Sequence, residues 1–244
     1  MFMKHIPVLA CIVLLSGQVS AQQFINKGMI EYEVKKNNHK AMGDGPWAEM
    51  FKDKVPKFST LYYQLTFEND KSIYRLSRKD DAPKFSWMND NSEDNIWYND
   101  YAQDYFVQQK DIFGDTYILS DSLIRIDWKI TNENREIAGF NCRKAVGKLF
   151  DSVYVFAFYT DEITVSGGPM SLHGLPGMIM GITIPRMFSS WVATKLQLTN
   201  IDDKKIVPPA KGKKKKAKEL QSTVIEATKD WGTYGQQQVW NIFL

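Results

Sequence analysis

The sequence is poor in cysteine and histidine and has almost no excess of either charge. It contains two cysteines and three histidines, and 31 basic side chains stand against 28 acidic ones. A net charge of +3 gives no electrostatic basis for binding nucleic acid. The sequence also has no phosphate-binding loop and no histidine-rich metal motif. We therefore expect no nucleic-acid partner and no cofactor.

A long apolar segment is also missing. The apolar run at residues 6–15 is about half as long as a helix that spans a bilayer. It follows Lys4 and precedes the small-residue pattern at 19–21, which is the order of a secretory signal peptide cleaved after Ala21. The sequence thus predicts an exported protein with a signal peptide at 1–21 and no transmembrane segment.

Removal of residues 1–21 leaves Cys142 as the only cysteine, so no internal disulfide can form. Cys11 ends a stretch that looks like a lipoprotein box, but it lies inside the apolar run and is a poor site for lipid attachment. A lone thiol in an oxidising compartment is buried, bound to metal or paired with another chain, and burial is the ordinary case. The fold must therefore rest on burial and hydrogen bonds.

Short extended segments fill residues 22–244, which we expect to form a single β-rich domain. Alternation of apolar and charged residues, or pairing across a turn, predicts strands at 30–35, 60–67, 72–76, 140–149, 153–159, 178–184 and 191–198. Further short strands are expected at 95–98, 105–109, 116–119 and 126–130. Strands at this spacing predict a mainly β fold, a single antiparallel curved sheet or half-barrel. A closed β-barrel or a β-sandwich is the alternative.

Helical patterns are few. Residues 46–54 suit a short helix, and residues 219–231 carry apolar side chains at near-helical spacing until Gly232 and Gly235 stop the pattern. Residues 202–218 contain paired prolines and four consecutive lysines, which predicts a mobile, exposed loop rich in Lys and Pro. The alternative is a docking site for anionic lipid headgroups or sugar phosphates.

Glycine and proline are concentrated in residues 167–177. This density indicates a backbone that turns sharply twice, with positive φ at glycine and fixed φ at proline. The order Leu-Pro-Gly predicts a type II turn that returns the chain into the strand at 178–184. Any ligand that the motif serves is to be sought next to it. The residues of this structural motif are Gly168, Pro169, Gly174, Leu175, Pro176 and Gly177.

Residues 128–182 resemble the GLPGLI family of exported proteins from Gram-negative bacteria, which is named after this turn. The matching segments are 128–130, 137–145, 158–163 and 168–169, together with the turn itself. Met178 stands where the family has leucine, and Phe158 stands in place of the tryptophan of a Trp-Tyr pair. The resemblance implies a location in the periplasm or at the outer membrane and a curved sheet similar to that of lipoprotein carriers. It implies no particular activity, because the family has none established.

Aromatic residues interspersed with Asp and Asn predict an exposed surface or a loop over a cavity. The alternative is that half of these rings face the core. We therefore expect a non-catalytic binding or accessory protein of the cell envelope that holds an apolar, peptide or glycan ligand, or assists an outer-membrane receptor. An apolar cavity under the sheet would favour a carrier, and a filled one a surface-interaction module. The candidate binding residues are Trp87, Trp97, Tyr98, Tyr105 and His173.

Two other functions stay open. A hydrolase or thiol enzyme would use Cys142 as nucleophile and His173 as base, yet Cys142 lies in an alternating strand with no helix start to lower its thiol pKa. A protein that binds a soft metal such as copper would use sulfur and imidazole ligands near the turn, although methionines there are usually core residues. We assign no catalytic residue. The candidate metal ligands are Cys142, Met170, His173, Met178 and Met180.

Overall fold

The computed structural model describes residues 24–79, 94–150, 152–198 and 202–243, so the predicted signal peptide and Trp87 lie outside the described residues. The strands are β1 (Lys27–Asn37), β2 (Phe58–Glu68), β3 (Lys71–Lys79), β4 (Ile96–Asp100), β5 (Tyr105–Ile112), β6 (Asp115–Ser122), β7 (Lys129–Ile137), β8 (Phe140–Leu149), β9 (Val153–Thr160), β10 (Met178–Ile184), β11 (Ser189–Gln197) and β12 (Lys213–Lys216). The α-helices are α1 (Asn38–Met42), α2 (Pro46–Lys52), α3 (Ala217–Thr228) and α4 (Gly232–Phe243), and short 3-10 turns are η3 (Pro185–Met187), η4 (Asp203–Lys205) and η5 (Lys229–Trp231).

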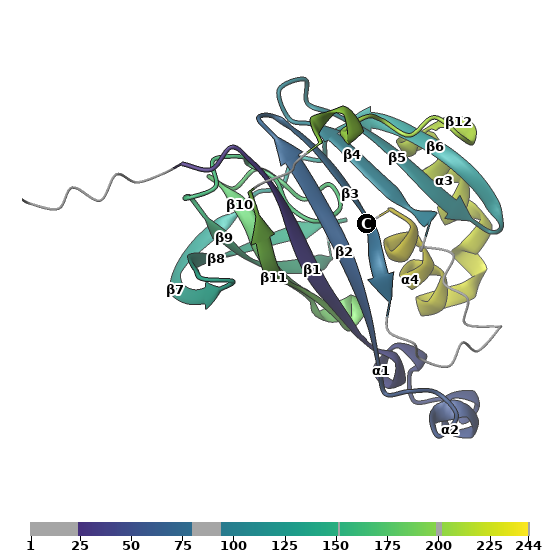
Figure 1. The fold of residues 1–244 in the computed structure, drawn as a ribbon. Helices are drawn as coiled ribbons and strands as arrows, with labels where there is room; N and C mark the ends of the chain where they lie inside the picture. Colours follow the sequence, from purple (N-terminus) through teal and green to yellow (C-terminus); the bar gives the residue numbers. More distant parts are fainter. Residues whose placement is uncertain (1–23, 80–93, 151, 199–201, 244) are drawn as a thin grey trace, which may run out of the picture.

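The described strands form one sheet of 12 strands in the order β12-β6-β5-β4-β3-β2-β1-β11-β10-β9-β8-β7 (Figure 1). The chain runs outward from β1 to β6, crosses to the opposite edge at β7, and returns to the centre at β11. Neighbours pair antiparallel except at β12, which lies parallel to β6. The described edge strands do not pair with each other, so the sheet is open. The prediction of a mainly β, curved open sheet is confirmed, and the closed barrel is not formed.

The connection from β6 to β7 shows how strongly the sheet curves. Ten strand spacings separate these two strands in the sheet order, which would be about 48 Å on a flat sheet. The connection is residues 123–128, and a chain of that length spans at most about 25 Å. The sheet must therefore curl until its two halves approach each other. Residues 126–128 belong to this crossover, whereas the sequence predicted a strand there.

Alternation of side chains along the central strands produces the core inside the curve. In β1, Ile30, Tyr32 and Val34 are buried at every second position, as the pattern predicted. β10 is apolar on both faces, and its burial is nearly complete because the sheet packs on one side and the loop before β10 packs on the other. Across this core the Tyr32 hydroxyl donates to the Ile179 carbonyl oxygen at 2.6 Å. The core therefore joins strands from both halves of the sheet.

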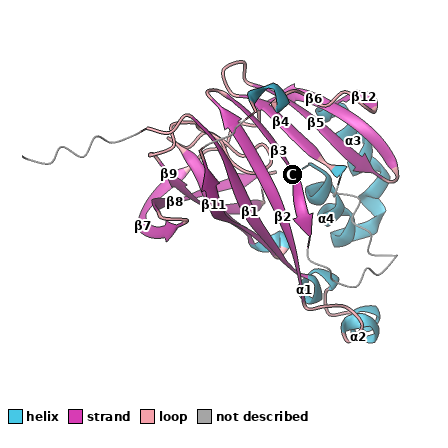
Figure 2. Cartoon of the chain, in the orientation of Figure 1, coloured by secondary structure: helices cyan, strands magenta, loops and turns pink. Residues whose placement is uncertain are grey.

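The C-terminal helices pack beside the β5–β6 part of the sheet (Figure 2). Leu220 and Val224 of α3, with Val239 and Phe243 of α4, form an apolar cluster with residues of β5 and β6. The sequence predicted a helix at 219–231 that ends before Gly232, so α4 is a correction. The described helices include none long and apolar enough to cross a membrane.

Residues 202–218 also differ from the predicted exposed loop. Lys213–Lys216 form β12, whose backbone pairs with β6 from Tyr117 to Ser120. Ile206 is buried against the outer face of the sheet, where it packs with Ile73, Tyr98 and Val107. The lysine side chains stay exposed while their backbone completes the sheet, because strand pairing depends on backbone groups and not on apolar side chains.

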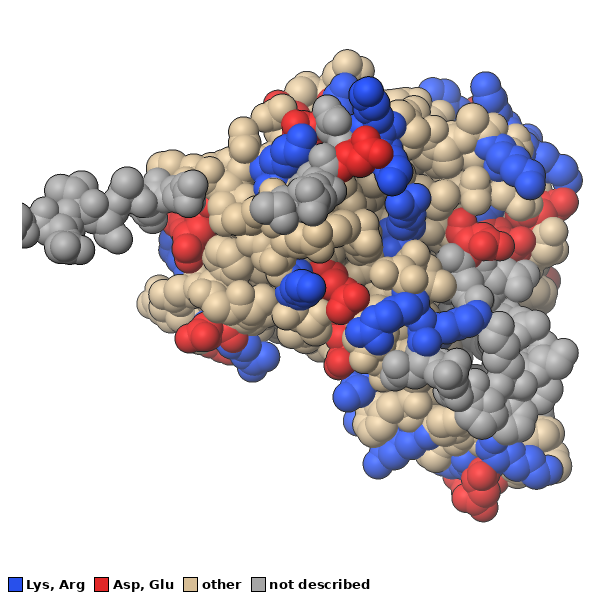
Figure 3. Space-filling view, in the orientation of Figure 1, with Lys and Arg blue, Asp and Glu red and all other residues tan. Residues whose placement is uncertain are grey.

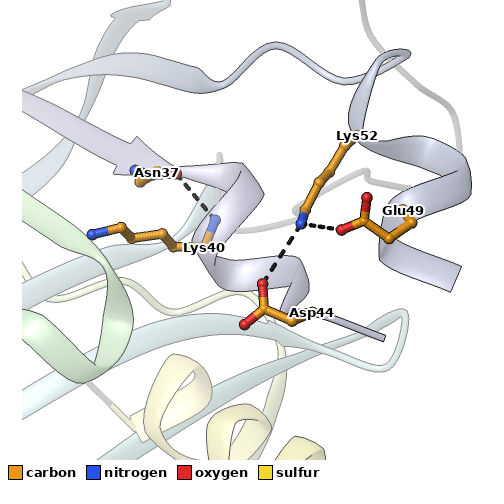
Figure 4. A network of polar contacts seen from close by, with 5 residues as sticks. All are labelled: Asn37, Lys40, Asp44, Glu49 and Lys52. Carbon is orange, nitrogen blue, oxygen red and sulfur yellow. Dashed lines mark hydrogen bonds and ion pairs between the residues drawn. The ribbon is translucent and has the colours of Figure 1, made fainter. Parts of the chain in front are cut away.

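Two short helices extend the lower end of β1 and β2. Asn37 ends β1 and caps α1, because its side-chain oxygen accepts a hydrogen bond from the Lys40 amide at 3.1 Å (Figure 4). α2 covers most of the helix predicted at 46–54, and its Lys52 ammonium lies 2.6 Å from Glu49 and 3.6 Å from Asp44. These exposed ion pairs stabilise the local structure only weakly.

Candidate functional site

The turn that the sequence emphasised is a sharp corner at the entrance to β10, but it is not a type II turn. The Gly177 amide donates to the Leu175 carbonyl oxygen at 2.8 Å, which is the three-residue closure of a γ-turn. The next amide, of Met178, donates to the Ile163 carbonyl oxygen at 3.1 Å instead of closing the predicted turn. The type II turn does not form because the Met178 amide pairs with the carbonyl oxygen of Ile163 and not with that of Leu175. Gly177 has φ +140°, so positive φ is confirmed.

Side-chain hydrogen bonds fix the motif loop before this corner. The Ser166 hydroxyl donates to the Leu175 carbonyl oxygen at 2.7 Å and accepts from the Gly174 amide at 3.2 Å. The Trp128 indole donates to the His173 carbonyl oxygen at 2.8 Å. From β4, the Asn99 amide donates to the Met170 carbonyl oxygen at 2.9 Å. The motif loop is therefore held from three sides as a rigid wall.

A pocket of about 350 Å³ opens beside this wall. The pocket is formed by β5, the end of β6 and the crossover after it, the end of β8, the motif loop, the first turn of α3 and the end of α4. Its lining is mainly apolar, and the size lies within the range of small-molecule sites. The apolar lining residues are Phe106, Ile124, Ile126, Leu149, Phe150, Met170, Leu172, Ala217 and Phe243.

Six of the lining residues are polar or charged, and hydrogen bonds at the pocket engage several of them. The Gln108 amide donates to the Ser171 hydroxyl at 2.9 Å, and both residues line the pocket. At the rim, the Asp121 carboxylate accepts from the Ser122 amide at 2.9 Å and from the Lys218 amide at 3.4 Å. One acidic and one basic residue face the pocket, so the charges nearly balance. The site is therefore suited to an uncharged apolar group.

A second hollow, of about 420 Å³, lies at the β2–β3 hairpin and has a different character. Charged and polar residues line it, and Asp100 accepts from the Gln103 amide at 3.1 Å while its other oxygen lies 3.8 Å from the Lys71 ammonium. Three acidic residues and one basic residue line this hollow, so it is polar and carries an excess of negative charge, unlike the apolar pocket. We regard the apolar pocket as the candidate functional site.

The predicted aromatic surface is corrected at two positions. Trp97 and Tyr98 are only 4% and 7% exposed, because successive residues of β4 point to opposite faces and both faces are covered. Tyr105, at the start of β5, is 37% exposed. The structure therefore does not gather these three rings on one open surface. Phe106, the neighbour of Tyr105, is the ring that lines the pocket.

Cys142 is fully buried in β8, and its thiol donates to the Phe140 carbonyl oxygen at 3.5 Å. Burial, aided by the nearby Glu162 carboxylate, raises the pKa of the Cys142 thiol to about 12. The thiol is therefore protonated at neutral pH, whereas a nucleophilic cysteine needs a thiolate. No hydrogen bond joins Cys142 to His173 among the described contacts.

His173 lies half-buried beside the pocket wall. Its ring centroid is 6.1 Å from that of Tyr101. Burial lowers the pKa of His173 below its usual value, although the Asp104 carboxylate and the Ile124 carbonyl oppose this effect. His173 is consequently uncharged at neutral pH, which is consistent with its place next to an apolar pocket.

The candidate metal ligands are mostly core residues. Cys142, Met170, Met178 and Met180 are each at most 4% exposed and belong to the large apolar cluster inside the curve. Within the described part of the chain, no three His, Cys, Asp or Glu side chains are grouped to hold a metal ion. A copper site with methionine ligands stays a prediction from the sequence.

Comparisons with known proteins give a match to a family of unknown function and a likeness of fold to two solved structures. The model of a family described as "Protein of unknown function (Porph_ging)" matches residues 147–181, which include the motif loop and its corner. A search of curated proteins finds no match.

Two solved structures of PNGF-II share the fold. In one crystal form the identity is 17% over 80% of this chain, with a TM-score of 0.51, and in the other it is 18% over 83%, with a TM-score of 0.52. This chain spans only about a third of the length of those proteins, 32% and 34%. An uncharacterized conserved protein from Thermus thermophilus is 6% identical over 76% of this chain and 90% of its own, with a TM-score of 0.38. At 17–18% identity the likeness to PNGF-II extends to the fold alone.

Proposed function

We propose that this chain is an exported, non-catalytic binding protein of the cell envelope that takes an uncharged apolar ligand group into the pocket beside the motif loop. The observation that carries the proposal is the pocket of about 350 Å³ with its largely apolar lining. An apolar surface that stays open to solvent costs free energy unless a ligand covers it. Export rests on the signal-peptide pattern at residues 1–21.

The rigidity of the wall supports a binding role. Asn99, Trp128 and Ser166 hold the motif loop at fixed positions, so the pocket is formed before a ligand arrives. A preformed site avoids the entropy loss of ordering a loop on binding. The volume of the pocket corresponds to roughly a dozen water-sized groups, which suits a short acyl chain, a ring system or a single large side chain of a partner.

A fluorescent probe tests this site directly. N-phenyl-1-naphthylamine is uncharged and becomes bright in apolar surroundings, so we expect the purified protein to bind it. Ala217 lines the pocket at the start of α3, and Ala217→Trp is expected to fill the space. Loss of about 1.4 kcal/mol or more of apolar contact weakens probe binding at least tenfold. Fluorescence titration measures the change.

The control is Ala217→Ser, which keeps the pocket open and should retain affinity within about twofold. Melting temperatures of both variants establish that each is folded. The proposal is wrong if the wild-type protein binds no probe, or if a folded Ala217→Trp variant binds it as well as the wild type does.

Native mass spectrometry identifies the natural ligand. Protein purified from the envelope of its own cells should carry an added mass that is absent from the Ala217→Trp variant. Recovery of the protein with the cytosolic fraction would contradict the proposed location.

A further inference from the structure

The edge of the sheet at β12 carries an unusual density of positive charge. Six lysines lie within residues 211–218: Lys211, Lys213, Lys214, Lys215, Lys216 and Lys218. All six are exposed, and basic side chains gather over β12 at the upper right of the molecule (Figure 3). Because successive residues of a strand point to opposite faces, the charge surrounds this edge on both sides. β12 is only four residues long, and a short edge strand is already protected from pairing with another chain, so edge protection does not account for six lysines.

Acidic neighbours neutralise only part of this charge. Lys213 lies 2.7 Å from the Asp115 carboxylate, which comes from the neighbouring strand. Among the described residues, no carboxylate lies within ion-pair distance of Lys214, Lys215 or Lys216. The backbone of these three lysines is paired in a strand, so the sheet and not a loose loop sets the spacing of their Cα atoms.

An exposed aromatic pair adjoins the same edge. Phe113 occupies the tip of the β5–β6 hairpin and is 63% exposed, and Trp231 is 48% exposed with its ring 6.3 Å from the Phe113 ring. Asp115, the partner of Lys213, is two residues from Phe113 on this hairpin, which places the pair close to the start of β12.

The backbone conformation at Phe113 is one that a bulky side chain rarely adopts. Phe113 has φ +54° and Gly114 has φ +86°, the two positive values of a type I′ hairpin turn. Asn is the residue preferred at the first of these positions, and a bulky side chain there is strained. The turn thus presents a large apolar ring to solvent at a position where a small polar residue would be more stable.

We propose that the β12 lysines and the Phe113–Trp231 pair together form a docking surface for an anionic lipid bilayer. Lysines attract the phosphate groups of the headgroups, and aromatic rings enter the boundary between headgroups and acyl chains. The charged edge would contact the headgroups, and the exposed rings beside it would contact the boundary between the headgroups and the acyl chains. A purely acidic protein partner would use the lysines and leave the rings without a role.

Vesicle sedimentation tests this surface. The purified protein should bind vesicles of phosphatidylglycerol and phosphatidylcholine, and should not bind vesicles of phosphatidylcholine alone. Each lysine near an anionic surface contributes about a fivefold gain in affinity, so Lys214→Gln, Lys215→Gln and Lys216→Gln together should weaken binding on the order of a hundredfold. A matched triple variant, Lys129→Gln, Lys148→Gln and Lys195→Gln, removes the same charge from exposed positions on β7, β8 and β11. This control should retain most of the binding.

Phe113→Asn separates docking from folding. Asn suits the left-handed turn position, so the melting temperature should stay the same or rise while vesicle binding falls several-fold. Equal losses in the two triple variants would overturn the proposal in favour of net charge alone. Binding to polyglutamate through the same lysines, without vesicle binding, would overturn it in favour of an acidic polypeptide partner.

Discussion

Gly177→Ala is expected to lower the free energy of unfolding by about 4 kcal/mol or to prevent folding. A Cβ at this position would lie 2.0 Å from the Thr160 carbonyl oxygen and 2.9 Å from the Asp161 Cα. These are backbone atoms at the end of β9, so they can move only if the pairing of β9 with β10 is disturbed. Positive φ adds strain of about 1–2 kcal/mol for alanine. Urea unfolding followed by tryptophan fluorescence measures the loss.

Gly139→Ala is the matched control for the strain at Gly177. Gly139 has φ +84°, but a Cβ added there would meet no atom within 4 Å. Its variant should therefore lose only the conformational term, about 1–2 kcal/mol. An equal loss in the two variants would show that close backbone approach is not what Gly177 provides. Weaker probe binding by a folded Gly177 variant would further link the corner to the pocket wall.

The sheet was largely predictable because local patterns specify most of its strands. β8 and β10 occupy the residues predicted for them, and the β2–β3 hairpin is longer than predicted by a few residues. Alternation in β1 and continuous apolar character in β10 both reflect burial, which acts through neighbouring side chains and is visible in sequence. The curvature was expected from the short spacing of the strands and from the family resemblance, and the short β6–β7 connection gives its physical requirement.

The C-terminal region was predicted less well because its structure depends on distant partners. Gly235 was interpreted as a helix stop, but a Cβ there would lie 2.3 Å from the Thr228 carbonyl oxygen, so glycine permits the close approach of α4 to the end of α3. β12 has no apolar alternation, and its pairing with β6 depends on a strand almost a hundred residues earlier. Neither contact leaves a local signal.

The candidate pocket could be located from the sequence only through the motif loop that lies beside it. Its lining comes from β5, β6, the crossover, the end of β8, the motif loop and two helices, and no spacing rule connects these segments. The motif did point to the place, because Met170, Ser171 and Leu172 lie between its two glycine-containing turns. Trp97 and Tyr98 were wrongly predicted to be exposed, because their polar neighbours suggested a loop over a cavity. Those neighbours, Asn99 and Asp100, are themselves buried at 0% and 3% exposure.

Alkaline pH is expected to unfold the protein, with stability falling from about pH 9 upward. Burial, aided by Glu162, raises the pKa of Cys142 to about 12 from an ordinary value near 9. Burial also raises the pKa values of Tyr32 and Tyr74 well above their usual value near 10. Between the unfolded and folded pKa values the native state keeps a proton that the unfolded chain has lost, so rising pH favours unfolding.

The size of this effect follows from the number of groups. Each contributes about 1.4 kcal/mol per pH unit above its unfolded pKa. Cys142 acts from pH 9, and the buried tyrosines join it above pH 10; Cys142, Tyr32 and Tyr74 alone give a total loss of about 6 kcal/mol by pH 11. That loss is comparable to the whole stability of many domains. Urea unfolding at pH 8, 9.5 and 11 measures the decline.

Cys142→Ala distinguishes the thiol from the other titrating groups. The variant should be less stable than the wild type at pH 8, because it loses buried side-chain volume in the core. Between pH 9 and 10, however, its stability should fall less steeply, because the group responsible for the decline is gone. The anionic forms of Cys142 and Tyr32 repel each other, which raises the pKa of Tyr32. Removal of the Cys142 thiol should therefore also make ionisation of Tyr32 easier in the folded state. Parallel curves for wild type and variant across pH 8–11 would show that the thiol ionises as readily inside the sheet as in water.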